Sequence, residues 1–216
     1  IPISNLVKSR IKKYYNLSSA ETIYPPVNTS LRVNKSQKKI DPYYLSLSRL
    51  VSYKKVNLSI QAAIELNKTL VVVGTGAQEK NLKKLSKGHK NIIFTGNISE
   101  DRVNYLLANC KALIMPGEED FGITGLEASI LGKPVIVFYK SGVAELLKNG
   151  IDSVFIKKET KKEIVKAIKK LETINFDTKL IKSRAKKHNT EKFKKEFEQK
   201  ILKSWKEFTE RTLCHT

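Results

Sequence analysis

Short apolar runs alternate with longer amphipathic stretches between residues 43 and 156, and this alternation restricts the fold more than any other feature. Apolar runs of this kind are typical of strands that are buried on both faces of a parallel sheet. Repeated strand-then-helix units of this length predict a doubly wound α/β domain with a parallel sheet. The predicted strands are residues 43–49, 70–73, 92–95, 112–115, 135–138 and 153–156. The predicted helices among them are residues 54–66, 78–85, 100–108 and 142–147.

The two ends of the chain have a different pattern. Residues 6–15 predict a basic helix, residues 22–24 a short strand, and Pro25 with Pro26 a stiff connector. From Glu159 onward the pattern is helical, and a final amphipathic helix places one apolar stripe opposite lysines. That stripe is formed by Phe193, Phe197, Ile201, Trp205 and Phe208.

A phosphate site is predicted where the strand at residues 112–115 runs into the next helix. This helix is predicted to begin at Gly122, so the free amides of Gly122, Ile123 and Thr124 point out of its N-terminus. The helix macrodipole favours an anion at that position. The Thr124 hydroxyl adds a further donor, and the absence of a side chain on Gly122 leaves room for the ligand.

Two carboxylates frame this predicted phosphate site. Glu119 lies in the loop and Glu127 in the helix, with seven residues between them. Carboxylates accept hydrogen bonds from vicinal hydroxyls, so a diphosphate that carries a hydroxyl-rich sugar on either side explains why acids lie beside an anion site. The alternative is an acidic loop that only caps an ordinary helix.

A pair of cations follows the first predicted strand. Arg49 and Lys54 lie beyond the strand end, where an arginine can bind a diphosphate with two parallel hydrogen bonds and a lysine as a point charge. Lys55 is a neighbour that could take the place of Lys54. The turn at Gly74 and Gly76 is a weaker signal, because it has neither the third glycine nor the acid that binds a dinucleotide.

These motifs resemble the signature of the retaining GT-B glycosyltransferases of family 4. Arg49 with Lys54 and Glu119 with Glu127 are its most specific parts, and the resemblance covers about residues 1–210. It implies a Rossmann-like sheet that forms the C-terminal half of a GT-B fold, followed by C-terminal helices. The implied organisation is the end of an acceptor domain and a linker (1–40), a nucleotide-sugar-binding domain (41–175) and C-terminal helices (176–216). The rest of the acceptor domain is expected outside this chain.

The resemblance also implies a role for each site residue. Arg49 and Lys54 are expected to hold the donor diphosphate and to help the leaving group depart, together with the amides of Gly122, Ile123 and Thr124. Glu127 is expected to accept the ribose hydroxyls, and Glu119 to hold hydroxyls of the donor sugar. Gly74 is expected to flank the nucleotide and Ile98 to lie near the nucleobase. Ser141 stands where the family has a glycine, and Glu145 is expected to brace the local turn.

The resemblance implies a donor and an acceptor as well. The sequence around Glu119 is most similar to that of mannosyltransferases, so GDP-mannose or another nucleotide-diphosphate sugar is the expected donor. The resemblance implies neither a metal nor a further cofactor. The expected acceptor is a glycan or a lipid-linked molecule that is bound through the acceptor domain. A nucleotide-sugar epimerase with the same fold is an alternative, although the sequence shows no acid–base set for that reaction.

The formal net charge of +20 suggests an anionic partner. Most of this charge is dispersed lysine that is not interleaved with aromatic residues, which is typical of a solvated surface and disfavours nucleic acid. A non-catalytic RNA- or membrane-binding module stays open. Cys110 and Cys214 are far apart, and no apolar run approaches the ~20 residues of a membrane span. We therefore expect a cytoplasmic protein with peripheral contact at the membrane face, and no structural zinc.

Overall fold

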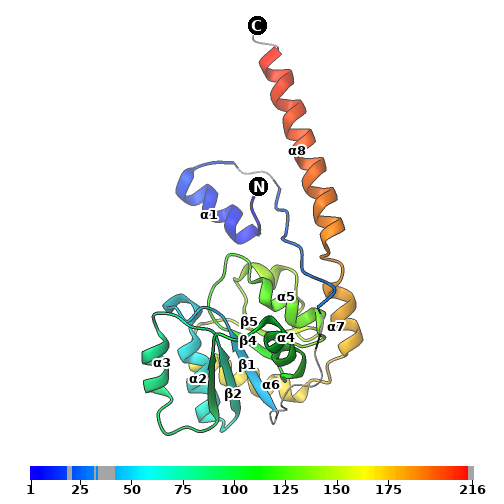
Figure 1. Cartoon of the computed structure of the whole chain (residues 1–216). Helices are drawn as coiled ribbons and strands as arrows, with labels where there is room; N and C mark the ends of the chain where they lie inside the picture. The colour runs from blue at the N-terminus through cyan, green and yellow to red at the C-terminus, as the bar shows by residue number, and fades with distance from the viewer. Residues whose placement is uncertain (19–20, 32, 34–41, 214–216) are drawn as a thin grey trace.

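A single parallel sheet forms the centre of the computed structural model, which describes residues 1–18, 21–31, 33 and 42–213 (Figure 1). The predicted domain boundary at residues 40 and 41 and Cys214 lie outside the described residues. All strand pairs are parallel, in the order β3-β2-β1-β4-β5-β6. The doubly wound sheet predicted from the sequence is confirmed. Its strands are β1 (Tyr43–Leu47), β2 (Thr69–Val73), β3 (Ile92–Gly96), β4 (Leu113–Met115), β5 (Val135–Phe138) and β6 (Ser153–Ile156).

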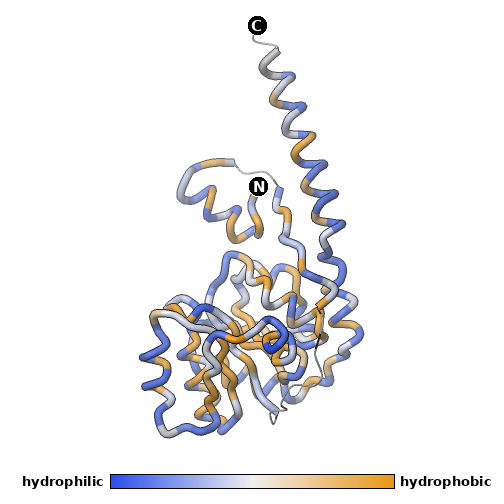
Figure 2. Tube along the Cα trace, in the orientation of Figure 1, coloured by the Kyte–Doolittle hydropathy of each residue, from blue (hydrophilic) through white to orange (hydrophobic). Residues whose placement is uncertain are grey.

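Helices cover both faces of the sheet. The described helices are α1 (Asn5–Tyr15), α2 (Val56–Glu65), α3 (Glu79–Leu85), α4 (Glu100–Asn109), α5 (Ile123–Ile130), α6 (Lys161–Thr173), α7 (Thr178–Ala185) and α8 (Thr190–Leu213), with 3-10 turns η1 (Ser52–Lys54) and η2 (Gly142–Glu145). Helices α2 and α6 pack together on one face, and α4, α5 and α7 lie on the other. Apolar segments therefore gather in the body of the molecule (Figure 2).

The strands are apolar on both faces because both faces are covered. Along β2, Val71 and Val73 enter the core beneath α4 and α5, whereas Leu70 and Val72 enter the core beneath α2 and α6. Each fully buried side chain of this kind contributes about 1.5–3 kcal/mol relative to an exposed one. Burial on both faces explains why these runs lack the polar alternation of a half-exposed strand.

The strand order reverses direction at the centre of the sheet. From β1 the chain proceeds outward to β2 and β3, and it then returns to place β4 on the other side of β1. The loops that leave β1 and β4 therefore diverge at the carboxyl edge. In doubly wound sheets this reversal point is where ligands bind.

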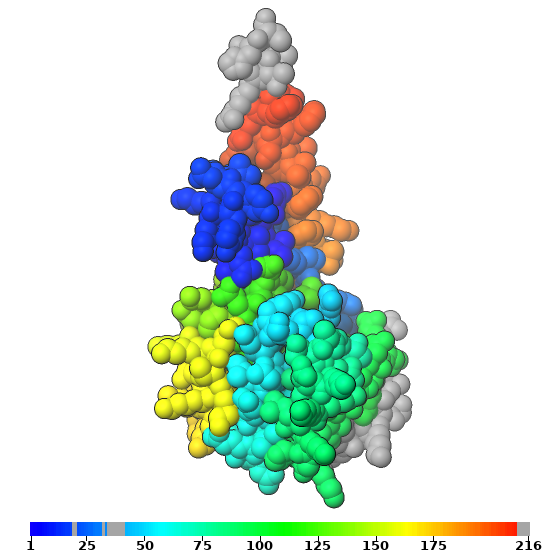
Figure 3. Space-filling model, turned by 90° about the vertical axis from the view of Figure 1, so that its left-hand side faces the viewer, coloured from blue at the N-terminus to red at the C-terminus, as the bar shows by residue number. Residues whose placement is uncertain are grey.

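Both ends of the chain extend beyond the carboxyl edge of the sheet. Figure 1 places α1 above that edge, and α8 projects away from the body past α1. In the space-filling view, α1 and α8 form a narrower part that stands on the body (Figure 3). None of the helices in the described ranges combines the length and the apolar character that crossing a membrane requires.

Three local predictions were wrong. Residues 22–24 are not a strand, because the Ile23 amide donates to the Pro2 carbonyl (3.1 Å) and the segment runs outside the sheet. The helix predicted at 54–66 begins only at Val56, because Lys55 has a positive φ of 54°. Residues 142–145 form a 3-10 turn rather than an α-helix; there the amides of Ala144 and Leu146 bond to the carbonyls three residues before them.

Candidate functional site

Two of the predicted site residues form an ion pair at the carboxyl edge of the sheet. The Lys54 Nζ atom lies 2.7 Å from Oε2 of Glu119, and the two side chains are only 16% and 13% exposed. Lys54 follows β1 and Glu119 follows β4, which are neighbours in the sheet. The reversal of strand order therefore brings the two charges together.

The loop that carries Glu119 is held by its backbone. The Glu119 carbonyl accepts a hydrogen bond from the Gly142 amide (2.9 Å), and its amide donates to Ser141 Oγ (3.2 Å). Ser141 Oγ in turn donates to the Gly117 carbonyl (3.1 Å). The serine in the expected glycine position thus binds the acidic loop at two points.

The glycine turn after β2 packs against the loop that carries the cations. A Cβ on Gly74, whose φ is +118°, would lie 2.1 Å from the Ser48 carbonyl oxygen. A Cβ on Gly117 would lie 2.1 Å from the Tyr53 carbonyl oxygen. These glycines therefore allow three loops to meet at backbone contact, which supports the position of Arg49 and Lys54. Arg49 itself is exposed at this edge.

The N-terminus of α5 opens toward the same edge. Gly122, with φ 92° and ψ 55°, is the N-cap, so the helix begins at Ile123, one residue later than predicted. The amides of Gly122, Ile123 and Thr124 donate no hydrogen bond to any other residue in the described part of the chain. Ile123 is 40% exposed, so these donors face an accessible surface.

Glu127 lies one turn further along α5 and is half-buried. Burial raises the pKa of its carboxyl group, and the negative charge of Glu100 at the start of α4 raises it further. Ile98 lies just before α4 and packs against the core beneath α4 and α5. Glu127 and Ile98 thus lie on the β4 and β3 sides of the carboxyl edge.

A comparison with protein families decides what kind of chain this is. Residues 28–191 match the family described as Glycosyl transferases group 1. The chain belongs to the group 1 glycosyltransferases. The region matched contains all six strands and every site residue considered above.

Relatives of this glycosyltransferase chain agree with the family. An uncharacterized glycosyltransferase of Methanocaldococcus jannaschii is 29% identical over 150 residues, which is 65% of this chain and 37% of the relative. An alpha-1,3/1,6-mannosyltransferase of Dictyostelium discoideum is 41% identical over 75 residues, which is 34% of this chain and 18% of the relative. The chain spans less than half the length of these curated relatives.

Solved structures confirm the fold of this glycosyltransferase chain. The crystal structure of Anabaena HepE in complex with UDP and glucose superposes with a TM-score of 0.78 at 17% identity. The match covers 94% of this chain and 62% of that structure. The chain is therefore a Rossmann-like domain of the GT-B fold followed by C-terminal helices.

A cleft of about 720 Å³ opens beside the ion pair in this glycosyltransferase chain. Of the predicted site residues, Lys54 and Glu119 line it, whereas Arg49, Glu127, the α5 N-terminus, Gly74 and Ile98 do not. Sequence reasoning missed the arginine that lines this cleft, Arg10 of α1. The available signal was its residue type, because Arg10 is one of only six arginines in a lysine-rich chain.

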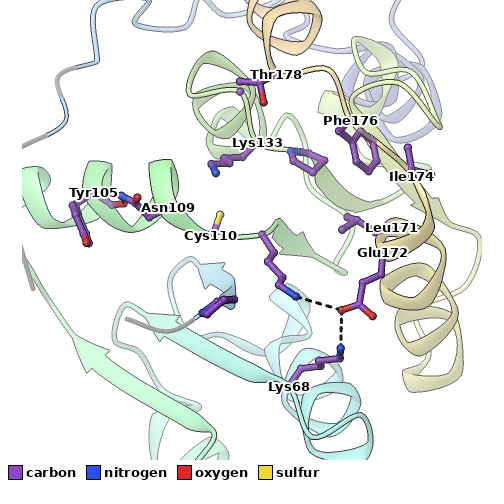
Figure 4. Close-up of a pocket in the computed structure, with 14 residues that line it drawn as sticks. Lys68, Tyr105, Asn109, Cys110, Lys133, Leu171, Glu172, Ile174, Phe176 and Thr178 are labelled. Atoms are coloured by element: carbon purple, nitrogen blue, oxygen red, sulfur yellow. Dashed lines mark hydrogen bonds and ion pairs between the residues drawn. The ribbon is translucent and has the colours of Figure 1, made fainter. Parts of the chain in front are cut away.

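A second cleft, of about 820 Å³, lies at the opposite, amino edge of the sheet (Figure 4). There, Glu172 Oε1 lies 2.7 Å from Lys68 Nζ and 3.7 Å from Lys111 Nζ, and it accepts a hydrogen bond from the Tyr44 hydroxyl (3.0 Å). The hydrogen bond from Lys68 lowers the pKa of Glu172. Burial raises the pKa of the Cys110 thiol to about 12, which disfavours its thiolate form at neutral pH.

Proposed function

We propose that this chain is the donor-binding domain of a retaining family 4 glycosyltransferase. In this proposal the enzyme transfers a hexose, mannose, from a nucleotide-diphosphate sugar to a glycan or lipid-linked acceptor. The observation that carries the proposal is the Lys54–Glu119 pair, which lies beside the open N-terminus of α5 at the reversal point of the sheet. A cation, a carboxylate and free amides are the groups that a diphosphate linked to a sugar requires.

The positive groups would stabilise the leaving diphosphate. When the bond between the anomeric carbon and the diphosphate oxygen breaks, negative charge develops on that oxygen and positive charge on the sugar ring. Lys54 is fixed by its pair with Glu119, and the amides of Ile123 and Thr124 are fixed by α5, so these groups need not reorganise as charge develops. The exposed side chain of Arg49 would add a further positive charge once the diphosphate is bound. The chemistry in this proposal needs no metal. The acceptor hydroxyl oxygen bonds to the anomeric carbon on the face from which the diphosphate leaves, and the hydroxyl proton passes to the departing diphosphate oxygen.

The two glutamates would orient the ribose and the sugar. Glu127 is half-buried and makes no side-chain hydrogen bond within the described part of the chain, so its oxygens are available to ribose hydroxyls. Glu119 is already fixed by Lys54 and is proposed to accept hydrogen bonds from the donor sugar near the reacting carbon. Gly74 and Ile98 are proposed to flank the nucleotide and its base. The same loop arrangement would thus bind all three parts of the donor.

The comparisons support the identity of the sugar and the class of the donor. The mannosyltransferase of Dictyostelium discoideum supports mannose, and the UDP and glucose in the HepE complex support a nucleotide-sugar donor. A complete active site would also need the acceptor domain, whose end and linker we propose to be residues 1–40. This chain is therefore expected to bind the donor and to transfer the sugar poorly. The lysine-rich surface is proposed to favour peripheral contact with anionic lipid.

Calorimetric titration with GDP-mannose, UDP-glucose, GDP and UDP tests the proposal. We expect saturable binding to the nucleotides of one base. We also expect that Glu127→Gln and Arg49→Met each weaken this binding about tenfold, or about 1.4 kcal/mol. Lys87→Met, which removes a charge from an exposed turn, is the matched control and should leave the affinity unchanged.

Salt dependence separates this proposal from nucleic-acid binding. The titrations are repeated at 50 and 300 mM salt, with a single-stranded RNA as the competing ligand. Affinity for RNA that rests on the +20 charge would fall steeply with salt. Tight, salt-sensitive RNA binding together with no binding of any nucleotide sugar would contradict the proposal.

A further inference from the structure

Arg10 of α1 binds the two acidic neighbours of Glu119. Its Nη2 atom lies 2.5 Å from Glu118 Oε1, and its Nη1 atom forms an ion pair with Asp120. Glu119, between them in the sequence, instead pairs with Lys54. Three successive acids are thus divided between two cations, with the outer two on Arg10 and the middle one on Lys54.

Two contacts outside Arg10 fix the start of α1 on the acidic loop. Ser4 Oγ donates to the Asp120 carbonyl (2.5 Å) and also accepts from the Val7 amide, as the N-cap of α1. Gly142 fits closely at this junction, since a Cβ there would lie 2.3 Å from the Asp120 carbonyl oxygen and 2.8 Å from Ser4 Cβ. The N-cap of its own helix, Ser4, therefore holds Arg10 beside the acidic loop independently of the arginine side chain.

Glu145 provides a second attachment for α1. Its carboxylate accepts hydrogen bonds from the amides of Asn5 (2.9 Å) and Leu6 (3.0 Å), where the helix macrodipole favours a negative charge. It also accepts from the Tyr24 hydroxyl (2.8 Å), and burial, together with this bond, raises the pKa of Tyr24 to about 12. The predicted role of Glu145 in its own local turn was therefore wrong, because the carboxylate binds α1 instead.

The arrangement has an electrostatic consequence at the cleft. Four carboxylates line it, those of Glu118, Glu119, Asp120 and Glu159. Glu159 is engaged by the Glu118 amide (3.0 Å). Without Arg10, the half-buried carboxylate of Glu118 would repel Glu119, which has the same charge, and would compete with it for Lys54. Asp120 is 59% exposed, so water screens its charge and its effect on Glu119 is smaller.

We propose that Arg10 is a positioning residue for Glu119. By binding Glu118 and Asp120, it keeps the Glu119 side chain on the Lys54 side of the loop, in the orientation that would receive the donor sugar. The inference rests on the proposed function, in which Glu119 binds that sugar and the other site residues bind the nucleotide diphosphate. It also makes the attachment of α1 a condition for recognising the sugar.

The test compares the affinity for GDP-mannose with that for GDP, or for UDP-glucose and UDP if the wild-type chain binds those. The ratio of the two affinities measures the contribution of the sugar to binding. We expect Arg10→Met to weaken sugar-nucleotide binding five- to tenfold and to leave nucleoside-diphosphate binding within twofold. Arg10→Lys, which can contact one acid at a time, should give an intermediate loss. Lys12→Met removes a charge from the exposed side of the same helix and should change neither affinity.

A double variant separates positioning from general destabilisation. If Arg10 acts through Glu119, Arg10→Met should cause no further loss in a Glu119→Gln background. Circular dichroism checks that each variant is folded. If Arg10→Met is unfolded, the same comparison is made with Arg10→Lys. Equal weakening of both ligands by Arg10→Met, or no weakening of either, would overturn the inference. Absence of any nucleotide binding by the wild-type chain would overturn the proposed function and this inference with it.

Discussion

The Lys54 ammonium and the Glu119 carboxylate are 2.7 Å apart, although 64 residues separate them in the sequence. The pair exists because β1 and β4 are neighbours at the point where the strand order reverses. The glycines at positions 74 and 117 then allow the loops around it to touch. The chemistry of the proposed site thus depends on the topology of the sheet as well as on the residues themselves.

Replacing Lys54 by methionine should weaken both the fold and the site. The substitution keeps the aliphatic stem but leaves the part-buried Glu119 carboxylate without its cation. We expect the free energy of unfolding to fall by about 1–3 kcal/mol in urea denaturation. Affinity for the nucleoside diphosphate should fall roughly tenfold in calorimetry, since one of the charges that bind the diphosphate is lost.

Lys55→Met is the matched comparison, because it removes an adjacent charge and because lysine and methionine, both unbranched, tolerate the positive φ of 54° at this position about equally. It should leave the nucleotide affinity within about twofold. If Lys55→Met weakened binding more than Lys54→Met, the assignment of the diphosphate ligand to Lys54 would be wrong.

Replacing Gly74 by alanine should be strongly destabilising. The new Cβ would lie 2.1 Å from the Ser48 carbonyl oxygen, and this oxygen cannot move without displacing the neighbouring residue Arg49. We expect a loss of about 2–4 kcal/mol in the free energy of unfolding, measured by urea denaturation.

Gly88→Ala separates the steric effect from the conformational one. Gly88 also has a positive φ, of 85°, but nothing lies within 4 Å of its Cβ position. Its substitution should cost only about 1–2 kcal/mol, the ordinary cost of that backbone conformation for an L-residue. Equal losses for Gly74→Ala and Gly88→Ala would refute the close approach of the loops.

Neutralising Glu127 should stabilise the free protein at neutral pH. The pKa of Glu127 is raised from its ordinary value of 4.5, so the folded state disfavours the ionised carboxylate. Above the raised pKa, Glu127 is ionised in both the folded and the unfolded chain, so the folded state carries the full free-energy cost of burying the charge. Glu127→Gln should therefore melt at a higher temperature than wild type at pH 7.5.

The difference in melting temperature between Glu127→Gln and wild type should shrink as the pH falls toward 4. Below the ordinary pKa, Glu127 of the wild-type chain is protonated and no longer carries a buried charge. Thermal denaturation of both proteins across this pH range measures the difference. Glu198→Gln, on the exposed surface of α8, should show no such dependence. A variant that is less stable than wild type at pH 7.5 would contradict the prediction.

The sheet could be predicted from the sequence because its strands are buried on both faces and therefore appear as uninterrupted apolar runs. The resemblance implied that Lys54 and Glu119 belong to one site, but their ion pair was not predicted, since the contact depends on strand order. The contacts of Glu145 and Arg10 could not be found in this way. Both residues bind partners more than 100 positions away, and neither contact leaves a local sequence pattern.

The central claim is that a nucleotide-diphosphate sugar binds at the carboxyl edge, with its diphosphate at the N-terminus of α5. The most direct test follows the backbone amide resonances of isotopically labelled protein by NMR while the nucleoside diphosphate is added. The account predicts that the amides of Ile123 and Thr124 shift most, because they would donate hydrogen bonds to phosphate. Shifts that instead cluster around Lys68, Lys133 and Thr178, at the amino-edge cleft, would contradict it.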